Sequence, residues 1–337
     1  MKPQTTAIAL ICTASTAMAD PAGLRQTEMY MPHHDTNASV TIWYPNSGGG
    51  DYERVAENPV FKGVDAVINA DIQSGTHPVV MFSHGMGGTS RAQAWLASAL
   101  ADRGAIVVSV DHVHSTWKDF NMAEGVKHWT RAADLTVALD QLLADPDFEG
   151  HIDPSRIMAA GFSYGGWTAL SLGGMTGDLA GIVETCTDYI DTMEACDMLL
   201  SDKVNMQGID PNAWNQSYAD ERITHVAAID PGFVWGLQAS NVADLVTDVL
   251  MVGFGAGTDR MSATNFDDSG LADLLSDAKF MRFDPAFHFT AMPLCKPGAE
   301  DILIAENDDP VCTDPVGTDR AAVHGAIIQA VAGELGL

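Results

Sequence analysis

Basic side chains are scarce in this chain. It has 17 Lys and Arg against 45 Asp and Glu, a formal net charge of −28 over 337 residues. So few cations cannot neutralise many phosphates, and the composition therefore argues against binding nucleic acid. The same shortage argues against attraction to anionic membranes. The charge indicates no particular reaction, because an acidic surface also simply keeps a protein soluble.

The chain also lacks an apolar run long enough to cross a bilayer. The apolar stretch near its start, residues 7–14, follows a lysine and leads to Ala17-Met18-Ala19. This arrangement is typical of a secretory signal peptide that is cleaved before Asp20, although a buried N-terminal helix would be the alternative. The first interpretation assigns residues 1–19 to the signal peptide and predicts a secreted or periplasmic protein.

Cysteine is sparse, and no Cys-x-x-Cys pattern of a zinc site occurs. Removal of a signal peptide would leave four cysteines in an oxidising compartment, which favours two disulfides. Cys186 with Cys196 and Cys295 with Cys312 would each close a short loop, although four cysteines allow three pairings. The histidines do not cluster near these cysteines, so the sequence predicts no metal site.

What the chain does contain is an alternation of strand and helix patterns. Continuous apolar runs such as HPVVMFSHG are typical of strands buried in a parallel sheet, and apolar residues at helical spacing follow them. The alternation predicts one α/β domain with a doubly wound, mostly parallel sheet. The expected strands are 38–45, 77–85, 105–112, 156–163, 223–230, 248–255 and 278–284, and the expected helices are 91–104, 131–145, a helix starting at 164, and 319–336.

Two stretches interrupt this alternation. Residues 46–51, NSGGGD, are the one low-complexity stretch, and they are interpreted as a surface turn. Residues 175–220 carry two of the cysteines and many acidic residues. They form either a small lid over the functional site or a surface excursion, and the lid is the preferred interpretation.

A Gly-x-Ser-x-Gly pentapeptide, GFSYG at 161–165, lies where a predicted strand meets a predicted helix. The five letters alone are weak evidence, because chance yields roughly one match per ten chains of this length. The strand–turn–helix context, however, is that of a nucleophile elbow, whose sharp turn needs small neighbours. The helix N-terminus also favours negative charge near Ser163. Ser163 is therefore the predicted nucleophile, and a glycine-rich loop without chemistry is the alternative.

A serine nucleophile needs a base, and the base needs an orienting acid. His288 follows the last predicted strand, in FDPAFHFTAMP, and is the predicted base. The competing histidines are His324 in the final helical pattern, His225 at a strand start, and His112 and His114, which precede the serine.

Two aspartates compete for the role of the acid. Asp230 ends one predicted strand and Asp259 follows the next, and both lie between Ser163 and His288 in the chain. The spacing leaves both residues open.

An oxyanion hole needs two backbone N–H groups aimed at the developing charge. Tyr164, directly after the nucleophile, and Met86, in the glycine-rich loop HGMGG after the strand 77–85, are the predicted donors. Further predicted pocket residues come from this loop and from apolar positions near the site: His84, Gly85, Trp167, Phe233 and Trp235. Trp167 and Phe233 have a core position as the alternative.

Together these motifs resemble the α/β-hydrolase superfamily, and more closely its branch of secreted platelet-activating-factor acetylhydrolases and bacterial predicted dienelactone hydrolases. The matching pieces are PVVMFSHGMGG, LASALADRGAIVVSVDH, IDPSRIMAAGFSYGGWTAL, HVAAIDPGF and FHFTAMPLC. The resemblance runs from about Val40 to the end of the chain, and it implies Ser163 as nucleophile, His288 as base, and Met86 and Tyr164 as oxyanion-hole donors.

The resemblance also bears on the acid and on the substrate. The acetylhydrolases place their acid after the strand that ends here in Asp230, whereas many bacterial relatives also have an aspartate at the position of Asp259. Asp230 is preferred, and both residues stay open. Dienelactone hydrolases proper use a cysteine nucleophile, so Ser163 argues against lactone specificity.

These features predict a secreted serine ester hydrolase that acts on short acyl chains through an acyl-enzyme and needs no metal or organic cofactor. The expected partner is a small-molecule, lipid or polymer ester. A non-catalytic binding protein on the same scaffold and an amidase or peptidase with the same triad are the alternatives.

Overall fold

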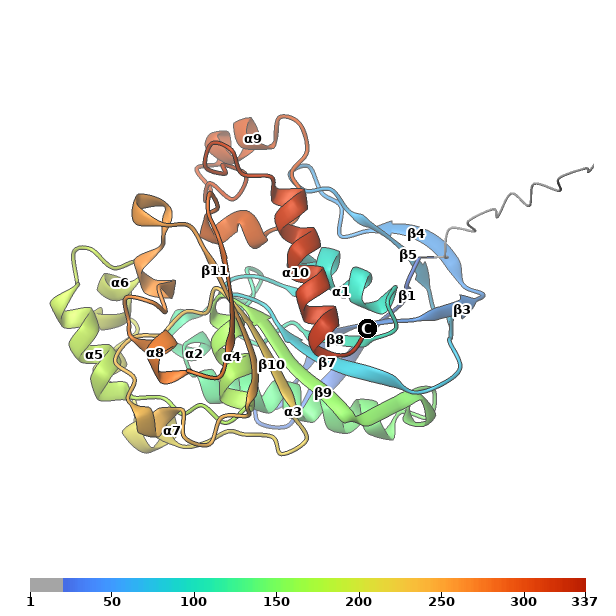
Figure 1. Ribbon diagram of the computed structural model, residues 1–337, viewed down its shortest axis with the longest axis horizontal. Helices are drawn as coiled ribbons and strands as arrows, with labels where there is room; N and C mark the ends of the chain where they lie inside the picture. Colours follow the sequence, from blue (N-terminus) through green and yellow to red (C-terminus); the bar gives the residue numbers. More distant parts are fainter. Residues whose placement is uncertain (1–20) are drawn as a thin grey trace, which may run out of the picture.

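The computed structural model describes residues 21–337, so the predicted signal peptide lies outside the described residues. A ten-stranded sheet runs through the molecule in the order β12-β11-β10-β9-β7-β8-β2-β1-β5-β4 (Figure 1). Its strands are β1 (Gly23–Met31), β2 (Thr36–Tyr44), β4 (Asp51–Val55), β5 (Val64–Ile68), β7 (His77–Ser83), β8 (Ile106–Val110), β9 (Ile152–Phe162), β10 (His225–Ile229), β11 (Asp248–Phe254) and β12 (Lys279–Phe283).

The parallel part of the sheet comprises β8, β7, β9, β10, β11 and β12. On its other side β2 pairs antiparallel with both β8 and β1. The predicted α/β class with a mostly parallel sheet is therefore confirmed. All parallel strands end at the same edge of the sheet, and that edge is where the residues that follow β7, β9, β10 and β12 gather.

Helices cover both faces of the sheet. The main ones are α1 (Ala94–Ala101), α3 (His128–Ala144), α4 (Tyr164–Leu172) and α10 (Arg320–Glu334). Successive side chains of a strand point to opposite faces of the sheet. Alternate residues of β7 therefore pack against helices on opposite faces. Val79 and Met81 pack in the cluster that contains α3 and α4, whereas Val80 and Phe82 pack in the cluster with α1 and α10.

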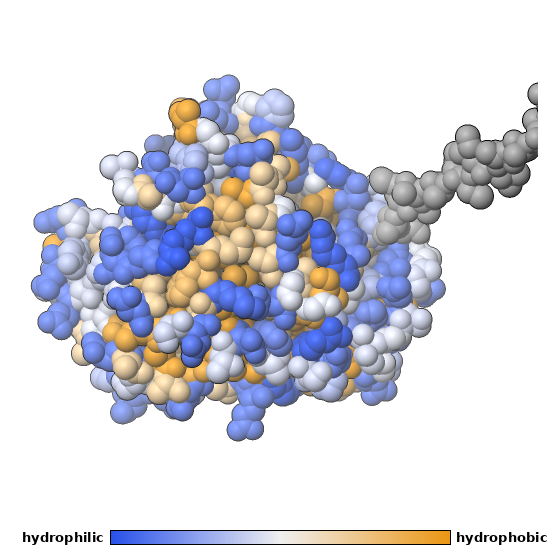
Figure 2. Space-filling view, in the orientation of Figure 1, coloured by the Kyte–Doolittle hydropathy of each residue, from blue (hydrophilic) through white to orange (hydrophobic). Residues whose placement is uncertain are grey.

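The surface is mostly polar, with apolar residues near the centre of the face that α10 crosses (Figure 2). No helix in residues 21–337 has the length and apolar content needed to cross a membrane.

The smaller helices are α2 (Met122–Gly125), α5 (Leu179–Asp188), α6 (Cys196–Leu200), α7 (Pro211–Asn215), α8 (Leu271–Leu274) and α9 (Ala299–Glu306).

The N-terminal strands are what the sequence patterns missed. β1, β4 and β5 were not expected, and β4 is almost wholly exposed, with the sequence DYERV, so it carries no apolar alternation. The prediction of a surface turn at 46–51 was wrong in part. Asn46–Gly48 forms β3, which pairs antiparallel with β6 (Asp71–Ile72), and only the glycines that follow make the turn.

The stretch 175–220 folds into α5, α6 and α7 around an apolar cluster of its own. Cys186 and Cys196 lie inside this cluster with Cα atoms 4.9 Å apart, and Cys295 and Cys312 lie with Cα atoms 5.9 Å apart. Both separations suit a disulfide. The first pair ties α5 to α6 and so keeps this segment compact.

The helix α4 approaches the end of β7 so closely that only glycine fits at Gly165. A Cβ atom at this position would overlap the backbone carbonyl of Ser83. The approach matters because it brings the N-terminus of α4 and the end of β7 side by side, and the site is built there.

We expect Gly165→Ala to lower the free energy of unfolding by about 1–3 kcal/mol, because the backbone of Ser83 must shift to admit the methyl group. Urea unfolding followed by circular dichroism measures the change. The matched control is Gly325→Ala in α10, where an added Cβ meets nothing within 4 Å. There stability should stay unchanged or rise by up to about 1 kcal/mol. Equal effects of the two variants would contradict the argument.

Candidate active site

Ser163 lies on a strained turn between β9 and α4. Its backbone angles are φ 57° and ψ −122°, a conformation that residues with a side chain rarely adopt. Hydrogen bonds hold the turn: the Ser163 N–H donates to the Ile229 carbonyl over 2.9 Å, and the Ser163 carbonyl accepts from the Gly232 N–H over 3.1 Å. Strain of this kind persists only where the surroundings enforce it.

His288 reaches Ser163 from the turn after β12. Its Nε2 lies 3.1 Å from Ser163 Oγ, and its Nδ1 lies 2.6 Å from Asp230 Oδ2. The imidazole is 4% exposed and packs on the ring of Phe162 with ring centres 4.7 Å apart. Because Nδ1 faces a carboxylate, it carries a proton, and in the neutral ring this leaves Nε2 as the acceptor that faces the hydroxyl.

Asp230 follows β10 directly and is fully buried. Its carboxylate accepts hydrogen bonds from Thr264 Oγ1 over 2.8 Å and from the Phe254 N–H over 3.2 Å, and it forms an ion pair with Arg260. Burial alone would raise the pKa of Asp230. The hydrogen bond from His288 and the charge of Arg260 outweigh burial and lower this pKa below its ordinary value, so Asp230 is ionised at neutral pH.

Asp259, the alternative acid, lies in the short turn Gly257–Asp259 after β11. Within residues 21–337 its carboxylate forms neither an ion pair nor a hydrogen bond with His288. The structure therefore brings Asp230 to the imidazole and leaves Asp259 outside. The next residue, Arg260, is the one that points inward to Asp230, and no motif in the sequence indicated this role.

The two predicted oxyanion donors flank Ser163. Tyr164 is the first residue of α4, so its N–H has no partner within the helix. Met86 lies in the loop after β7, where Gly87 N–H donates to the Ser115 carbonyl over 2.8 Å. The loop comes close to the serine, since a Cβ added at Gly85 would lie 3.2 Å from the Cβ of Ser163.

Arg131, on α3, holds this loop in place with hydrogen bonds. It was not predicted from the sequence. Its guanidinium is 1% exposed and donates to the His84 carbonyl, to Ser83 Oγ over 3.1 Å and to Ser115 Oγ over 2.5 Å. It also stacks on the ring of Tyr164, 5.0 Å from the ring centre. Burial lowers the pKa of Arg131 to about 10, which keeps it charged at neutral pH.

Two of the predicted pocket residues do not line the site. His84 is buried, and its Nε2 accepts from the His112 N–H over 3.0 Å while its Nδ1 contacts the Gly85 carbonyl over 2.7 Å. Trp167 is also buried and packs against His128 in the core, which is the position that the alternative interpretation of the sequence gave it. Neither reaches a cavity at Ser163, so His84 supports the loop and Trp167 supports α4.

Two cavities meet at Ser163. The smaller, of about 210 Å³, is almost wholly apolar and lies between α4 and the segment 175–220. The larger, of about 570 Å³, opens on the other side of Met86 and includes Gly85. Two of the residues named as pocket candidates, Phe233 and Trp235, line the smaller cavity together with Met122, Ile182, Met193, Met198 and Leu199.

No model of a known protein family and no curated protein sequence matches this chain. Solved structures do match, and they share the α/β-hydrolase fold, which is the fold of this chain. One is a ferulic acid esterase from Streptomyces cinnamoneus, with 18% identity, a TM-score of 0.57, and coverage of 96% of this chain and 91% of that one. Another is a dienelactone hydrolase-like promiscuous phosphotriesterase from metagenomic libraries, with 16% identity, a TM-score of 0.51, and coverage of 94% and 99%.

The buried ion pair between Arg260 and Asp230 gives a prediction about stability. Arg260→Met should lower the free energy of unfolding by about 3–5 kcal/mol at pH 7, because it leaves a buried carboxylate without its counter-charge. The pKa of Asp230 is lowered in the folded protein, so the benefit is full above the ordinary carboxyl pKa of about 3.9 and is lost as the pH falls below it.

Urea unfolding of wild type and variant at several pH values measures this. The matched control is Arg54→Met, whose ion pair with Asp65 is about 40% exposed on both sides and should contribute less than about 1 kcal/mol. A loss in Arg260→Met no larger than that of the control, or a loss that persists unchanged at low pH, would contradict the assignment.

Proposed function

We propose that the protein is a serine hydrolase that cleaves carboxylic esters. The observation that carries the proposal is the continuous line of hydrogen bonds from Asp230 through His288 to Ser163, with distances of 2.6 and 3.1 Å, at the junction of two cavities. A hydroxyl on a strained elbow, a base within reach and a buried acid behind it are the parts that activate a serine.

In the proposed reaction, Ser163 Oγ attacks the ester carbonyl carbon while His288 Nε2 takes the hydroxyl proton. Asp230 holds the imidazole in the right tautomer and stabilises its positive form. The Met86 and Tyr164 N–H groups receive the oxyanion of the tetrahedral intermediate. His288 then protonates the leaving alcohol, and a water that it deprotonates releases the acid from the acyl-enzyme. The steps use only side chains and backbone of this chain.

The two cavities suggest how an ester would lie. The smaller, apolar cavity suits a short acyl chain, since it offers about 210 Å³ and almost no polar surface. The larger cavity would take the alcohol part, and Glu306, Asp308 and Asp309 on its wall disfavour an anionic alcohol. The segment 175–220 would act as the lid that closes the acyl side, because Ile182, Met193 and Leu199 come from it.

The proposal places the protein outside the cytoplasm, in the periplasm or the medium. The N-terminal signal-peptide pattern supports this, and so do two cysteine pairs at disulfide separation, because such bonds persist in oxidising compartments.

Replacement of the nucleophile tests the reaction class. Ser163→Ala should reduce hydrolysis of p-nitrophenyl acetate by about 10³-fold or more without unfolding the protein, because within residues 21–337 the hydroxyl hydrogen-bonded to His288 is that of Ser163 alone. A fluorophosphonate probe should label wild type and not this variant. The matched control, Ser217→Ala at an exposed serine, should keep both activity and labelling. Turnover or labelling retained in Ser163→Ala would contradict the mechanism, and a wild type that binds esters without turnover or labelling would be a binding protein.

Replacement of each aspartate tests the acid. Asp230→Asn should lower kcat by about 10⁴-fold, because an amide favours the wrong tautomer of His288. Asp259→Asn is the matched control and should stay within about threefold of wild type. Kinetics on p-nitrophenyl acetate, corrected for the folded fraction by circular dichroism, measure both. A larger loss in Asp259→Asn than in Asp230→Asn would reverse the assignment.

A further inference from the structure

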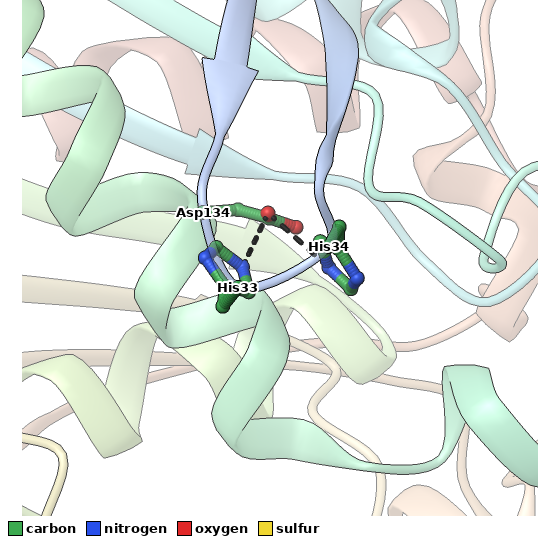
Figure 3. Close-up of side chains that lie close together, drawn as sticks. All are labelled: His33, His34 and Asp134. Atoms are coloured by element: carbon green, nitrogen blue, oxygen red, sulfur yellow. Dashed lines mark hydrogen bonds and ion pairs between the residues drawn. The ribbon is translucent and has the colours of Figure 1, made fainter.

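Three potential metal ligands meet where the turn between β1 and β2 contacts α3 (Figure 3). His33 and His34 lie in that turn, and Asp134 lies on α3. His33 Nε2 is 3.0 Å and His34 Nε2 is 3.5 Å from Asp134 Oδ1. We propose that these side chains bind one divalent transition-metal ion, with Zn²⁺ as the preferred ion and water as the fourth ligand.

The spacing of the ligand atoms suits zinc. Zinc binds histidine nitrogen and carboxylate oxygen at about 2.0–2.1 Å in a tetrahedron, so two of its ligand atoms lie about 3.3 Å apart. The two distances to Asp134 Oδ1 lie on either side of this value, and all three ligand atoms are within 4.8 Å of one another. Small movements of the two rings would therefore complete the site.

His34 lacks the partner that its burial demands. Its side chain is 9% exposed, and its Nε2 is buried without a hydrogen-bond partner in the part of the chain that the structure describes. A buried polar atom without a partner costs free energy, and a metal ion would satisfy it.

Asp134 forms no direct ion pair with an arginine or lysine within residues 21–337. It is fully buried, and its two carboxylate oxygens face His33 and His112 at hydrogen-bond distance. Its ion-pair partners in the described part of the chain are all histidines, none of which carries a permanent charge. A divalent cation would place a positive charge in direct contact with Asp134 Oδ1.

The arrangement also has the outer partner that metal-binding carboxylates usually have. His112 Nδ1 donates to Asp134 Oδ2 over 2.8 Å, which leaves Oδ1 facing the two histidines of the turn. Two imidazoles and one carboxylate favour zinc and its transition-metal neighbours over Ca²⁺ or Mg²⁺, which prefer oxygen ligands. His33 is 25% exposed on its side chain, which gives the ion a path from solvent and room for a water ligand.

No metal site was predicted from the sequence, because the histidines do not cluster near the cysteines. The proposed ligands lie far from every cysteine in the sequence, and two of the three are separated from the third by about a hundred residues of chain. The metal proposal does not rest on the proposed ester hydrolysis, because the ion would not contact the reacting atoms.

Metal binding is tested on the purified chain after treatment with a chelator and dialysis. Titration with Zn²⁺ should give one ion per chain by calorimetry and elemental analysis. X-ray absorption at the zinc edge should show only nitrogen and oxygen ligands at about 2.0–2.1 Å, with no sulfur. Free Zn²⁺ at about 100 times its Kd should raise Tm by roughly 3–5 °C, and Ca²⁺ should not.

Two variants and a control assign the ligands. His33→Ala and His34→Ala should each weaken Zn²⁺ binding by more than about 100-fold, which exceeds the loss typical of an outer partner, and should abolish the rise in Tm. His151→Ala, at a histidine outside the cluster, should behave as wild type. His33 is the more exposed of the two, so its variant keeps the test valid if His34→Ala fails to fold. Absence of Zn²⁺ binding to wild type, sulfur in the first shell, or equal binding by the His33→Ala variant would overturn the proposal.

Discussion

The structure depends most on the burial of one ionised carboxylate, that of Asp230. A charge removed from water must be met by charges and hydrogen bonds. Asp230 meets this need with His288 from the turn after β12 and with Arg260 and Thr264 from the segment after β11. The same carboxylate thus fixes three segments against one another and sets the imidazole opposite Ser163. Its position is both a folding constraint and the basis of the proposed chemistry.

The shortage of basic residues makes the placement of two arginines informative. The chain has 17 Lys and Arg, yet Arg131 and Arg260 are buried beside the site rather than spread over an acidic surface. Arg260 meets the carboxylate behind His288. Arg131 holds the loop that carries Met86 and stacks on Tyr164, so it contacts the supports of both proposed oxyanion donors. The Arg260 guanidinium therefore stabilises the acid behind His288, and the Arg131 guanidinium stabilises the segments that carry the proposed oxyanion donors.

The features that could be predicted from the sequence are those that depend on residues close together in the chain. The buried strands that became β7 and β9 had continuous apolar runs, and the turn at Ser163 had its glycines, so the elbow was expected at the right place. β4 was not expected, because an exposed edge strand needs no apolar pattern.

Long-range contacts decided the rest. Asp230 and Asp259 both follow strands between Ser163 and His288, and the long-range contact of His288 Nδ1 with Asp230 is what distinguishes them. Trp167 resembles a pocket residue in sequence, but helix packing buries it against His128. The role of Arg131 could not be predicted from the sequence, because its partners lie in other segments of the chain. These partners are Ser83, His84 and Ser115.

The helix α3 connects the proposed metal site with the proposed oxyanion side. Arg131 and Asp134 are three residues apart, so they lie one above the other on the same face of α3. Asp134 contacts His112, and His112 Nε2 lies 2.9 Å from Ser83 Oγ, to which Arg131 also donates. Packed elements transmit small displacements because their interiors have few voids. An ion that fixes the β1–β2 turn to Asp134 would therefore also restrain the helix that holds the loop of Met86. The metal would act on the site through the rigidity of α3, and it would do so without taking part in the reaction.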